Sequence, residues 1–236
     1  MRSIEEVMKD VHRVAKIYPA GSGHFVYTSG MHGDGYVDYR PLKAKEYTVL
    51  LREVSVHLLR QTVLRCELDP NRGITVIGPQ TMGTLMVDAI TAADMLGELE
   101  DFAELNTRKL NKHPDDEDAF VWDIDPQNVL LDSQIIAMDD LLNTGKTLAI
   151  SARMVEEYGA SISAVATIGD RCNVSAEKIG ARNIVSLEEH SRFTIYHPDD
   201  CALCLECSPI VLHPGHGHNF QKEHVAHPGG FIESPE

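Results

Sequence analysis

The sequence predicts an α/β protein, with a parallel β-sheet flanked by helices. Short apolar runs alternate with helical stretches between residues 74 and 187, and glycines or polar turns separate them. The composition changes on either side of this part. We therefore expect N-terminal helices with a connecting segment in residues 1–70, called the hood segment below, an α/β core in residues 71–190, and an irregular Cys/His-rich tail in residues 191–236.

The first 70 residues contain two expected helices. Ser3 and Glu6 form a capping-box pattern in front of an apolar face that includes Ile4, Val7, Met8, Val11 and Val14. A second amphipathic helix is marked by Tyr47, Leu51, Val54 and Leu58. Between them lies the hood segment, the glycine-rich and aromatic stretch "GSGHFVYTSGMHGDGYVDYRPL" of residues 21–42.

The core should alternate strands with helices. The expected elements, in chain order, are a strand at 74–78, a helix at 83–96, a strand at 101–105, a polar loop from 106, a strand at 135–138, a helix at 146–158, a strand at 164–169, a short helix ending near Gly180, and a strand at 183–187.

The stretch "IIAMDDLLNTGKTL" (135–148) carries the most specific chemistry. A nucleotide-binding P-loop would need a glycine at position 140, where Asp140 stands. Backbone N–H groups of Asn143–Thr147 could instead hold a terminal phosphate at a helix N-terminus. Asp139 and Asp140 could accept hydrogen bonds from vicinal hydroxyls, so a ribose 5-phosphate fits. The alternative is a solvated acidic pair beside a helix cap.

Three other segments sit near expected strand ends. "GPQTMGT" (78–84) offers backbone N–H groups to an anion, or is a plain strand–helix loop. "RKLNK" (108–112) is either a run of charged residues exposed to solvent or a mobile basic lid over a phosphorylated ligand. Arg171 in "GDR" (169–171) could bind an anionic substrate or pair with Asp170 at the surface.

Charge and cysteine usage restrict the class of protein. A formal net charge of −15 argues against a nucleic-acid-binding surface. The charged start "MRSIEEVMKD" does not read as a signal peptide, and no apolar run reaches membrane-spanning length. Five cysteines without a secretion signal predict reduced thiols and a cytoplasmic protein.

Taken in order, these segments resemble the type I phosphoribosyltransferases. "IIAMDDLLNTGKTL" resembles the family's motif for phosphoribosyl pyrophosphate (PRPP), and "VIGPQTMGT" (76–84) resembles its pyrophosphate loop. The similarity is closest to orotate phosphoribosyltransferases, through the hood segment, the basic "RKLNK" and the arginine of "GDR". It covers roughly residues 1–190.

The resemblance implies the type I phosphoribosyltransferase fold and transfer of a ribose 5-phosphate from PRPP to a nucleobase, with orotate favoured. It implies that Mg²⁺ is held mainly through PRPP, and that a homodimer exchanges its lids. The residues it implies for PRPP binding are Asp139, Asp140, Asn143, Thr144, Gly145, Lys146, Thr147, Pro79, Gln80 and Thr81. The catalytic residues would be Arg108, Lys109, Lys112 and Asp140, and the base-binding residues Arg171 and Tyr36.

Some positions depart from the orotate enzymes. Thr28 stands where they usually carry lysine, and Val37 follows Tyr36 where they carry a second aromatic residue. Asn143 stands where 6-oxopurine enzymes carry an aspartate, which counts against a hypoxanthine-guanine enzyme. Transfer to another base, or a non-catalytic PRPP-sensing regulator, remain the alternatives.

The tail contains Cys201, Cys204 and Cys207, followed by His213, His216 and His218. The first Cys-x-x-Cys has a spacing that suits a structural zinc ion. The alternative is three reduced thiols, because a second ligand pair with zinc-finger spacing is missing.

Overall fold

The computed structural model describes residues 2–190, 193–224 and 226–235, except the side chains of residues 117 and 118. The chain forms two compact units, each assembled from two separate stretches. The first unit comprises Met1–Val11 and Leu42–Glu189, and the second comprises His12–Pro41 and His190–Glu236.

Both expected N-terminal helices are confirmed. Helix α1 (Ile4–Val14) begins with the predicted capping box: the Ser3 backbone N–H donates to the Glu6 carboxylate at 3.0 Å, and the Glu6 N–H donates to Ser3 Oγ at 3.3 Å. These two bonds satisfy donors that the helix start leaves unpaired. Helix α2 (Thr48–Arg65) buries its apolar residues, among them Leu51, Val54 and Leu58.

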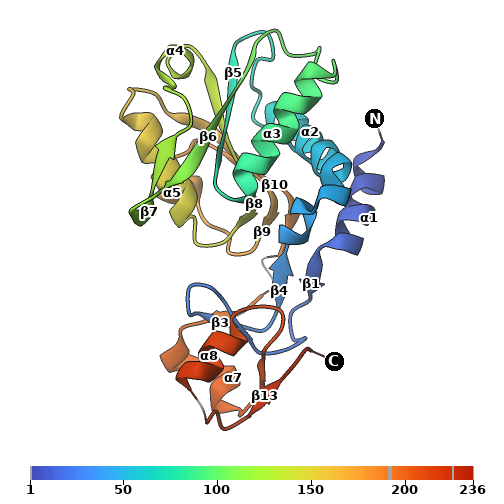
Figure 1. Ribbon diagram of the computed structural model, residues 1–236, viewed down its shortest axis with the longest axis vertical. Helices are drawn as coiled ribbons and strands as arrows, with labels where there is room; N and C mark the ends of the chain where they lie inside the picture. The colour runs from blue at the N-terminus through green and yellow to red at the C-terminus, as the bar shows by residue number, and fades with distance from the viewer. Residues whose placement is uncertain (1, 191–192, 225, 236) are drawn as a thin grey trace. The chain divides into compact units, whose positions relative to one another are not determined.

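The first unit is built on a six-stranded sheet in the order β10-β9-β8-β5-β6-β7 (Figure 1). Its strands are β5 (Ile74–Pro79), β6 (Leu105–His113), β7 (Asp116–Trp122), β8 (Gln134–Leu142), β9 (Ile162–Asp170) and β10 (Ile184–Glu189). Every neighbouring pair is parallel except β6 with β7, which is antiparallel. The predicted fold class is therefore confirmed, with one added antiparallel edge strand.

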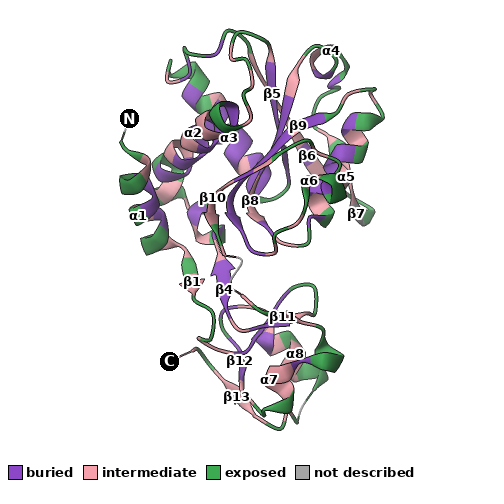
Figure 2. Ribbon diagram, turned by 180° about the vertical axis from the view of Figure 1, so that it is seen from behind, coloured by how far each residue is buried: buried purple, intermediate pink, exposed green. Residues whose placement is uncertain are grey.

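Helices cover both faces of this sheet. Because side chains alternate along each strand, a different set of apolar side chains packs against the helices on each face. Ile135 and Ala137 of β8 face helix α5 (Lys146–Glu156), where they pack with Leu148 and Val155. Because successive side chains of a strand point to opposite faces, Ile136 and Met138 lie on the other face, toward helix α3 (Met82–Met95). Figure 2 shows the central strands as the buried part of this unit.

Two shorter α-helices also belong to the first unit, and a 3-10 helix (Lys45–Tyr47) precedes α2. Helix α4 (Gln127–Leu130) precedes β8, and helix α6 (Ala176–Ile179) follows β9. The sequence predicted a short helix ending near Gly180, and α6 ends there. Gly180 itself has a left-handed conformation, at φ 83°.

The segment 101–113 corrects two expectations. Residues 101–104 do not form a strand, and the polar residues 106–113, expected to be a loop, belong to the nine-residue strand β6. Only Leu110 is fully buried there, so β6 shows little of the apolar periodicity that marks strands. Pairing with β5 on one side and β7 on the other supplies its backbone hydrogen bonds instead.

The second unit combines short strands around an aromatic core. Strand β1 (Lys16–Tyr18) pairs with β4 (Tyr36–Asp38), and β3 (His32–Gly33) lies between β2 (Phe25–Val26) and β11 (Ile195–Tyr196). The tail adds β12 (Ile210–Val211) paired with β13 (Phe231–Ile232), and the short helices α7 (Ala202–Leu205) and α8 (Gly217–Glu223). Phe25, Tyr27, Tyr36 and Val211 form the buried centre.

Within the described part of the chain, no helix combines the length and apolar character needed to cross a membrane.

Candidate active site

The order of the strands brings the predicted site segments of the first unit to one edge of the sheet. Strands β9, β8, β5 and β6 are neighbours and run parallel, so their carboxyl ends meet at the same edge. These ends carry Arg171, the Asp139–Asp140 pair, the loop after Pro79, and Lys112. Ligands of open α/β sheets bind at this edge.

The acidic pair lies within the last residues of β8, and a tight loop connects it to α5. Gly145 is the residue before the helix and has φ 77°, a left-handed conformation. A side chain there would also press on Val174 and Ile179, at 3.2 and 3.1 Å, so glycine suits this position doubly. The first N–H groups of α5 have no intrahelical partner and point out of the helix start, which can hold an anion.

Asp139 sits in an unusual electrostatic environment. Its Oδ1 accepts the Asp140 backbone N–H at 3.0 Å, and the backbone N–H of Gly83 also hydrogen-bonds to its carboxyl group. Burial raises the pKa of Asp139 well above its usual value, and the adjacent Asp140 carboxylate raises this pKa further. Hydrogen bonds from hydroxyl groups, or a nearby cation, would therefore stabilise the charged form of this pair.

The β5–α3 loop packs directly against β8. A Cβ on Gly83 would lie 2.6 Å from the Met138 carbonyl oxygen, so only glycine allows α3 to begin this close to the acidic strand. Gln80 joins the loop to β6: its backbone N–H donates to Leu110 O, and its side-chain oxygen accepts the Lys112 N–H, both at 2.8 Å. Pro79 ends β5 and has no N–H to offer an anion.

The end of β9 is tied to the loop after β8. The Arg171 N–H donates to the Leu142 carbonyl at 2.9 Å, and the Cys172 thiol donates to Asn143 Oδ1 at 3.1 Å. Burial raises the pKa of Cys172, which keeps the thiol protonated for this bond. Arg171 is buried, only 4% exposed, which does not fit the alternative of a surface ion pair. Asp170 instead accepts the N–H groups of Cys172 and Asn173.

The three predicted lid cations project from both faces of β6. Lys109 faces α3, where its Nζ pairs with Asp88 at 2.9 Å. By strand alternation, Arg108 and Lys112 lie on the face of Leu110, which packs toward α5. Lys109 and Lys112 therefore belong to opposite faces of the sheet. The sequence did not indicate this arrangement, because the segment was expected to be a loop.

The predicted base-binding residue Tyr36 belongs to the second unit. The residue is 5% exposed, and the centre of its ring lies 5.5 Å from the centre of the Phe25 ring. Arg40 donates to the Tyr36 hydroxyl at 3.1 Å and to the Asp38 carboxylate at 2.7 and 2.8 Å. The aromatic and Asp-x-Arg parts of the hood segment thus form one connected network.

Thr28, which replaces the usual lysine, has a tail partner within the second unit. Its Oγ1 lies 2.9 Å from Nε2 of His216. The sequence contained no signal for this contact, because the two residues are far apart along the chain.

A polar pocket of about 350 Å³ lies at the other end of the sheet. Its lining includes Ser133 and Gln134 at the start of β8, and Ser161 and Ser163 at the start of β9. These are amino ends of strands, so the pocket is separate from the candidate active site.

Comparison with known proteins supports the predicted resemblance. The chain is 26% identical over 202 residues to the orotate phosphoribosyltransferase of Chlorobaculum parvum, covering 84% of this chain and 90% of that protein. It is 29% identical over 196 residues to the orotate phosphoribosyltransferase of Desulforamulus reducens, covering 80% and 87%. No family model matches the sequence.

Solved structures show the same fold. Orotate phosphoribosyltransferase from Aeropyrum pernix superposes with a TM-score of 0.53 at 20% identity, over 79% of this chain and 93% of that one. Adenine phosphoribosyltransferase from Saccharomyces cerevisiae gives 0.52 at 15% identity, over 78% and 99%. The resemblance to the type I phosphoribosyltransferases, with orotate enzymes as similar relatives, is confirmed.

Proposed function

We propose that this chain, which has the type I phosphoribosyltransferase fold, transfers the ribose 5-phosphate group of PRPP to a nucleobase and releases pyrophosphate. One observation carries the proposal. The strand order β9-β8-β5-β6 brings Arg171, the Asp139–Asp140 pair, the loop after Pro79 and the basic strand β6 to one edge of the sheet. The similarity to orotate phosphoribosyltransferases supports it independently.

In this proposal the β8–α5 segment binds the ribose 5-phosphate part of PRPP. Asp139 and Asp140 accept hydrogen bonds from the vicinal ribose hydroxyls. The loop Asn143–Thr147 receives the 5-phosphate, through backbone N–H groups at the start of α5 and the hydroxyls of Thr144 and Thr147. Because Asp139 is already hydrogen-bonded to Gly83 and Asp140, its orientation is set before the substrate arrives.

The leaving pyrophosphate would lie over the β5–α3 loop, beneath the β6–β7 hairpin that closes over the site. Loss of pyrophosphate builds positive charge on the ribose and negative charge on the leaving group, so the protein mainly has to place and stabilise charges. Thr81 and the start of α3 offer hydrogen bonds, and Lys109 and Lys112 offer positive charge from the hairpin that closes over the site. The carboxylates of Asp139 and Asp140 are oxygen donors of the kind Mg²⁺ prefers, and the bound ion would neutralise charge on the pyrophosphate.

Orotate is the base that we propose, giving orotidine 5'-monophosphate for pyrimidine biosynthesis. Arg171 stands beside the acidic strand, and its guanidinium can bind a carboxylate with two hydrogen bonds. Adenine has no carboxylate, so this residue distinguishes the two bases. The fold does not distinguish them, because the solved orotate and adenine enzymes resemble the chain almost equally.

The test is to mix the purified protein with PRPP, Mg²⁺ and orotate, and to follow the loss of orotate absorbance. We expect turnover that requires PRPP and is lost in Arg171→Ala. Arg153→Ala, which changes an exposed arginine on α5, is the matched control and should keep its rate. Turnover with adenine but not orotate would refute the choice of base. PRPP binding by calorimetry without turnover of either base would refute both substrates and favour another base or a PRPP sensor.

We further propose a homodimer in which the β6–β7 hairpin of each chain closes over the active site of the other. Lys109→Ala and Asp140→Asn chains should each keep less than about a tenth of the wild-type activity alone. Mixed dimers should recover activity, because one of their two sites has an intact acidic pair and an intact lid. Absence of recovery in dimers shown to be mixed would contradict the exchange.

A further inference from the structure

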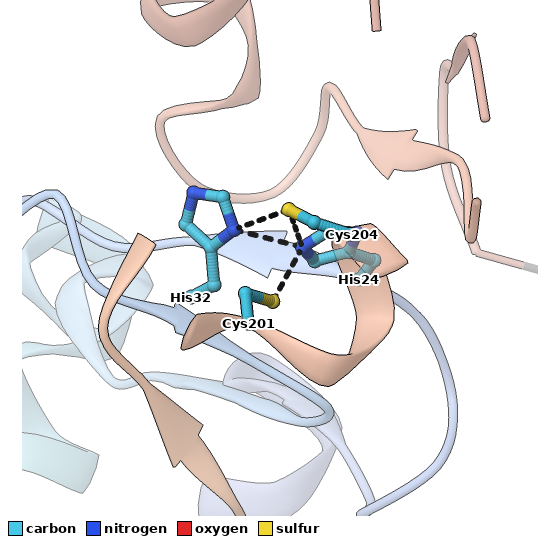
Figure 3. Close-up of side chains that lie close together, drawn as sticks. All are labelled: His24, His32, Cys201 and Cys204. Carbon is cyan, nitrogen blue, oxygen red and sulfur yellow. Dashed lines mark hydrogen bonds between the residues drawn. The ribbon is translucent and has the colours of Figure 1, made fainter. Parts of the chain in front are cut away.

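The second unit buries a group of four side chains that can bind a metal ion: His24, His32, Cys201 and Cys204 (Figure 3). The histidines come from the hood segment and the cysteines from the tail, so sequences far apart contribute two ligands each. One ring nitrogen or sulfur atom of each residue lies within 4.8 Å of the others. His24, His32 and Cys201 are each at most 1% exposed.

Four of the six distances between these atoms are given by their contacts and lie within about 0.4 Å of those in a tetrahedral zinc site. His24 Nε2 lies 2.9 Å from His32 Nδ1, 3.5 Å from Cys201 Sγ and 3.8 Å from Cys204 Sγ. Cys204 Sγ lies 3.3 Å from His32 Nδ1. With the usual zinc–nitrogen and zinc–sulfur lengths, a tetrahedron places two nitrogens about 3.3 Å apart and a nitrogen and a sulfur about 3.6 Å apart.

The hydrogen bonding of His24 determines which of its ring nitrogens can bind the metal. Its Nδ1 lies 3.1 Å from the Ser208 carbonyl oxygen, which can only accept, so Nδ1 carries the proton. Nε2 then presents a single lone pair to the other three groups. One lone pair cannot accept a separate hydrogen bond from each of them, whereas a shared cation satisfies all four. Such a carbonyl partner is also typical of metal-binding histidines.

We propose that His24, His32, Cys201 and Cys204 bind one structural zinc ion. Two thiolates and two imidazoles are a donor set that zinc prefers, and protein atoms occupy all four positions. Such a closed and buried site has no open position for a substrate. The ion would therefore hold the hood segment and the tail together and take no part in the reaction.

This site differs from the trio of tail cysteines that the sequence suggested. Cys207 is exposed and stands outside the group, in a left-handed conformation at φ 56°. The remaining ligands are histidines of the hood segment, which no local spacing could reveal. A second group, His213, His218 and Glu233, is more exposed and contains no sulfur, so it provides an internal control.

The first experiment measures the metal content of the 236-residue chain, purified with zinc in the medium and passed through a desalting column. We expect about one zinc per chain. Cys201→Ser and His32→Gln should lose it. The matched controls Cys207→Ser and His213→Ala should retain it. A wild-type chain without zinc would overturn the proposal, and so would equal losses in the controls.

Because loss of a buried ligand could also unfold the variants, a second measurement uses the wild-type chain. Cobalt(II) replaced into the site should give a thiolate-to-metal charge-transfer band and the intense visible bands of tetrahedral coordination. Zinc should abolish both, and Cys207→Ser should show them unchanged. A weak octahedral spectrum without charge transfer would overturn the assignment. Neither result depends on which base the protein uses, or on whether it is an enzyme.

Discussion

Replacing Asp139 by asparagine should stabilise the protein and weaken PRPP binding at the same time. Asparagine keeps an oxygen that can accept the N–H groups of Asp140 and Gly83, and it removes the charge. Residue 139 as a whole is only partly buried, but burial dominates the proton affinity of its carboxyl group. Opposite effects on stability and binding would separate a functional acidic pair from an ordinary helix cap.

The sign of the stability change follows from the raised pKa. A carboxyl group whose pKa is higher in the folded state binds its proton more readily there, so the charged form opposes folding once the pH exceeds the unfolded value of about 3.9. This unfavourable contribution to the free energy of folding grows as the pH rises to the pKa of the folded state, and it stays constant at higher pH. Asp139→Asn should therefore make the protein more stable at pH 7.5, where the charged carboxylate opposes folding, and should change its stability little near pH 4.

The binding change follows from the hydrogen bonds to ribose. A hydrogen bond to a charged group contributes about 1.5–3 kcal/mol and one to a neutral group about 0.5–1.5. Loss of the charge should therefore cost about 1.2 kcal/mol of PRPP affinity, roughly 8-fold in Kd. Urea unfolding at both pH values and calorimetry with PRPP measure the two effects.

The exposed Asp132→Asn is the control, on the amino side of β8, and should change neither quantity. The reasoning is refuted if Asp139→Asn destabilises the protein at pH 7.5 or binds PRPP as tightly as the wild type.

Three further changes test the elements around the site. Gly83→Ala places a Cβ 2.6 Å from Met138 O, so we expect a loss of about 1–3 kcal/mol in urea unfolding and weaker PRPP binding; Gly73→Ala, with 3.5 Å of clearance, should be tolerated. Leu148→Ala should cost about 2–5 kcal/mol because α5 packs the core through this residue, whereas the exposed Leu131→Ala should fall within about 0.5 kcal/mol. Lys109→Ala breaks a partly exposed ion pair, so it should cost at most about 1 kcal/mol of stability but reduce kcat more than tenfold; a normal kcat would remove Lys109 from the mechanism.

Local patterns in the sequence were sufficient for the central strands and for the position of the acidic pair. The runs at 74–78, 135–138 and 164–169 are buried strands, because a strand covered on both faces must be apolar throughout. Gly145 and Gly180 mark left-handed positions next to helices, which depend only on the local backbone. The parallel topology then makes the carboxyl ends a common edge.

Tertiary structure alone decided the features that depend on distant partners. Strand β6 has one fully buried residue, so its existence depends on pairing with β5 and β7 and not on its own periodicity. The opposite faces of Lys109 and Lys112 follow from that pairing. The four metal-binding side chains carry no joint signal in the sequence, because His24 and His32 approach Cys201 and Cys204 only when the hood segment and the tail fold together.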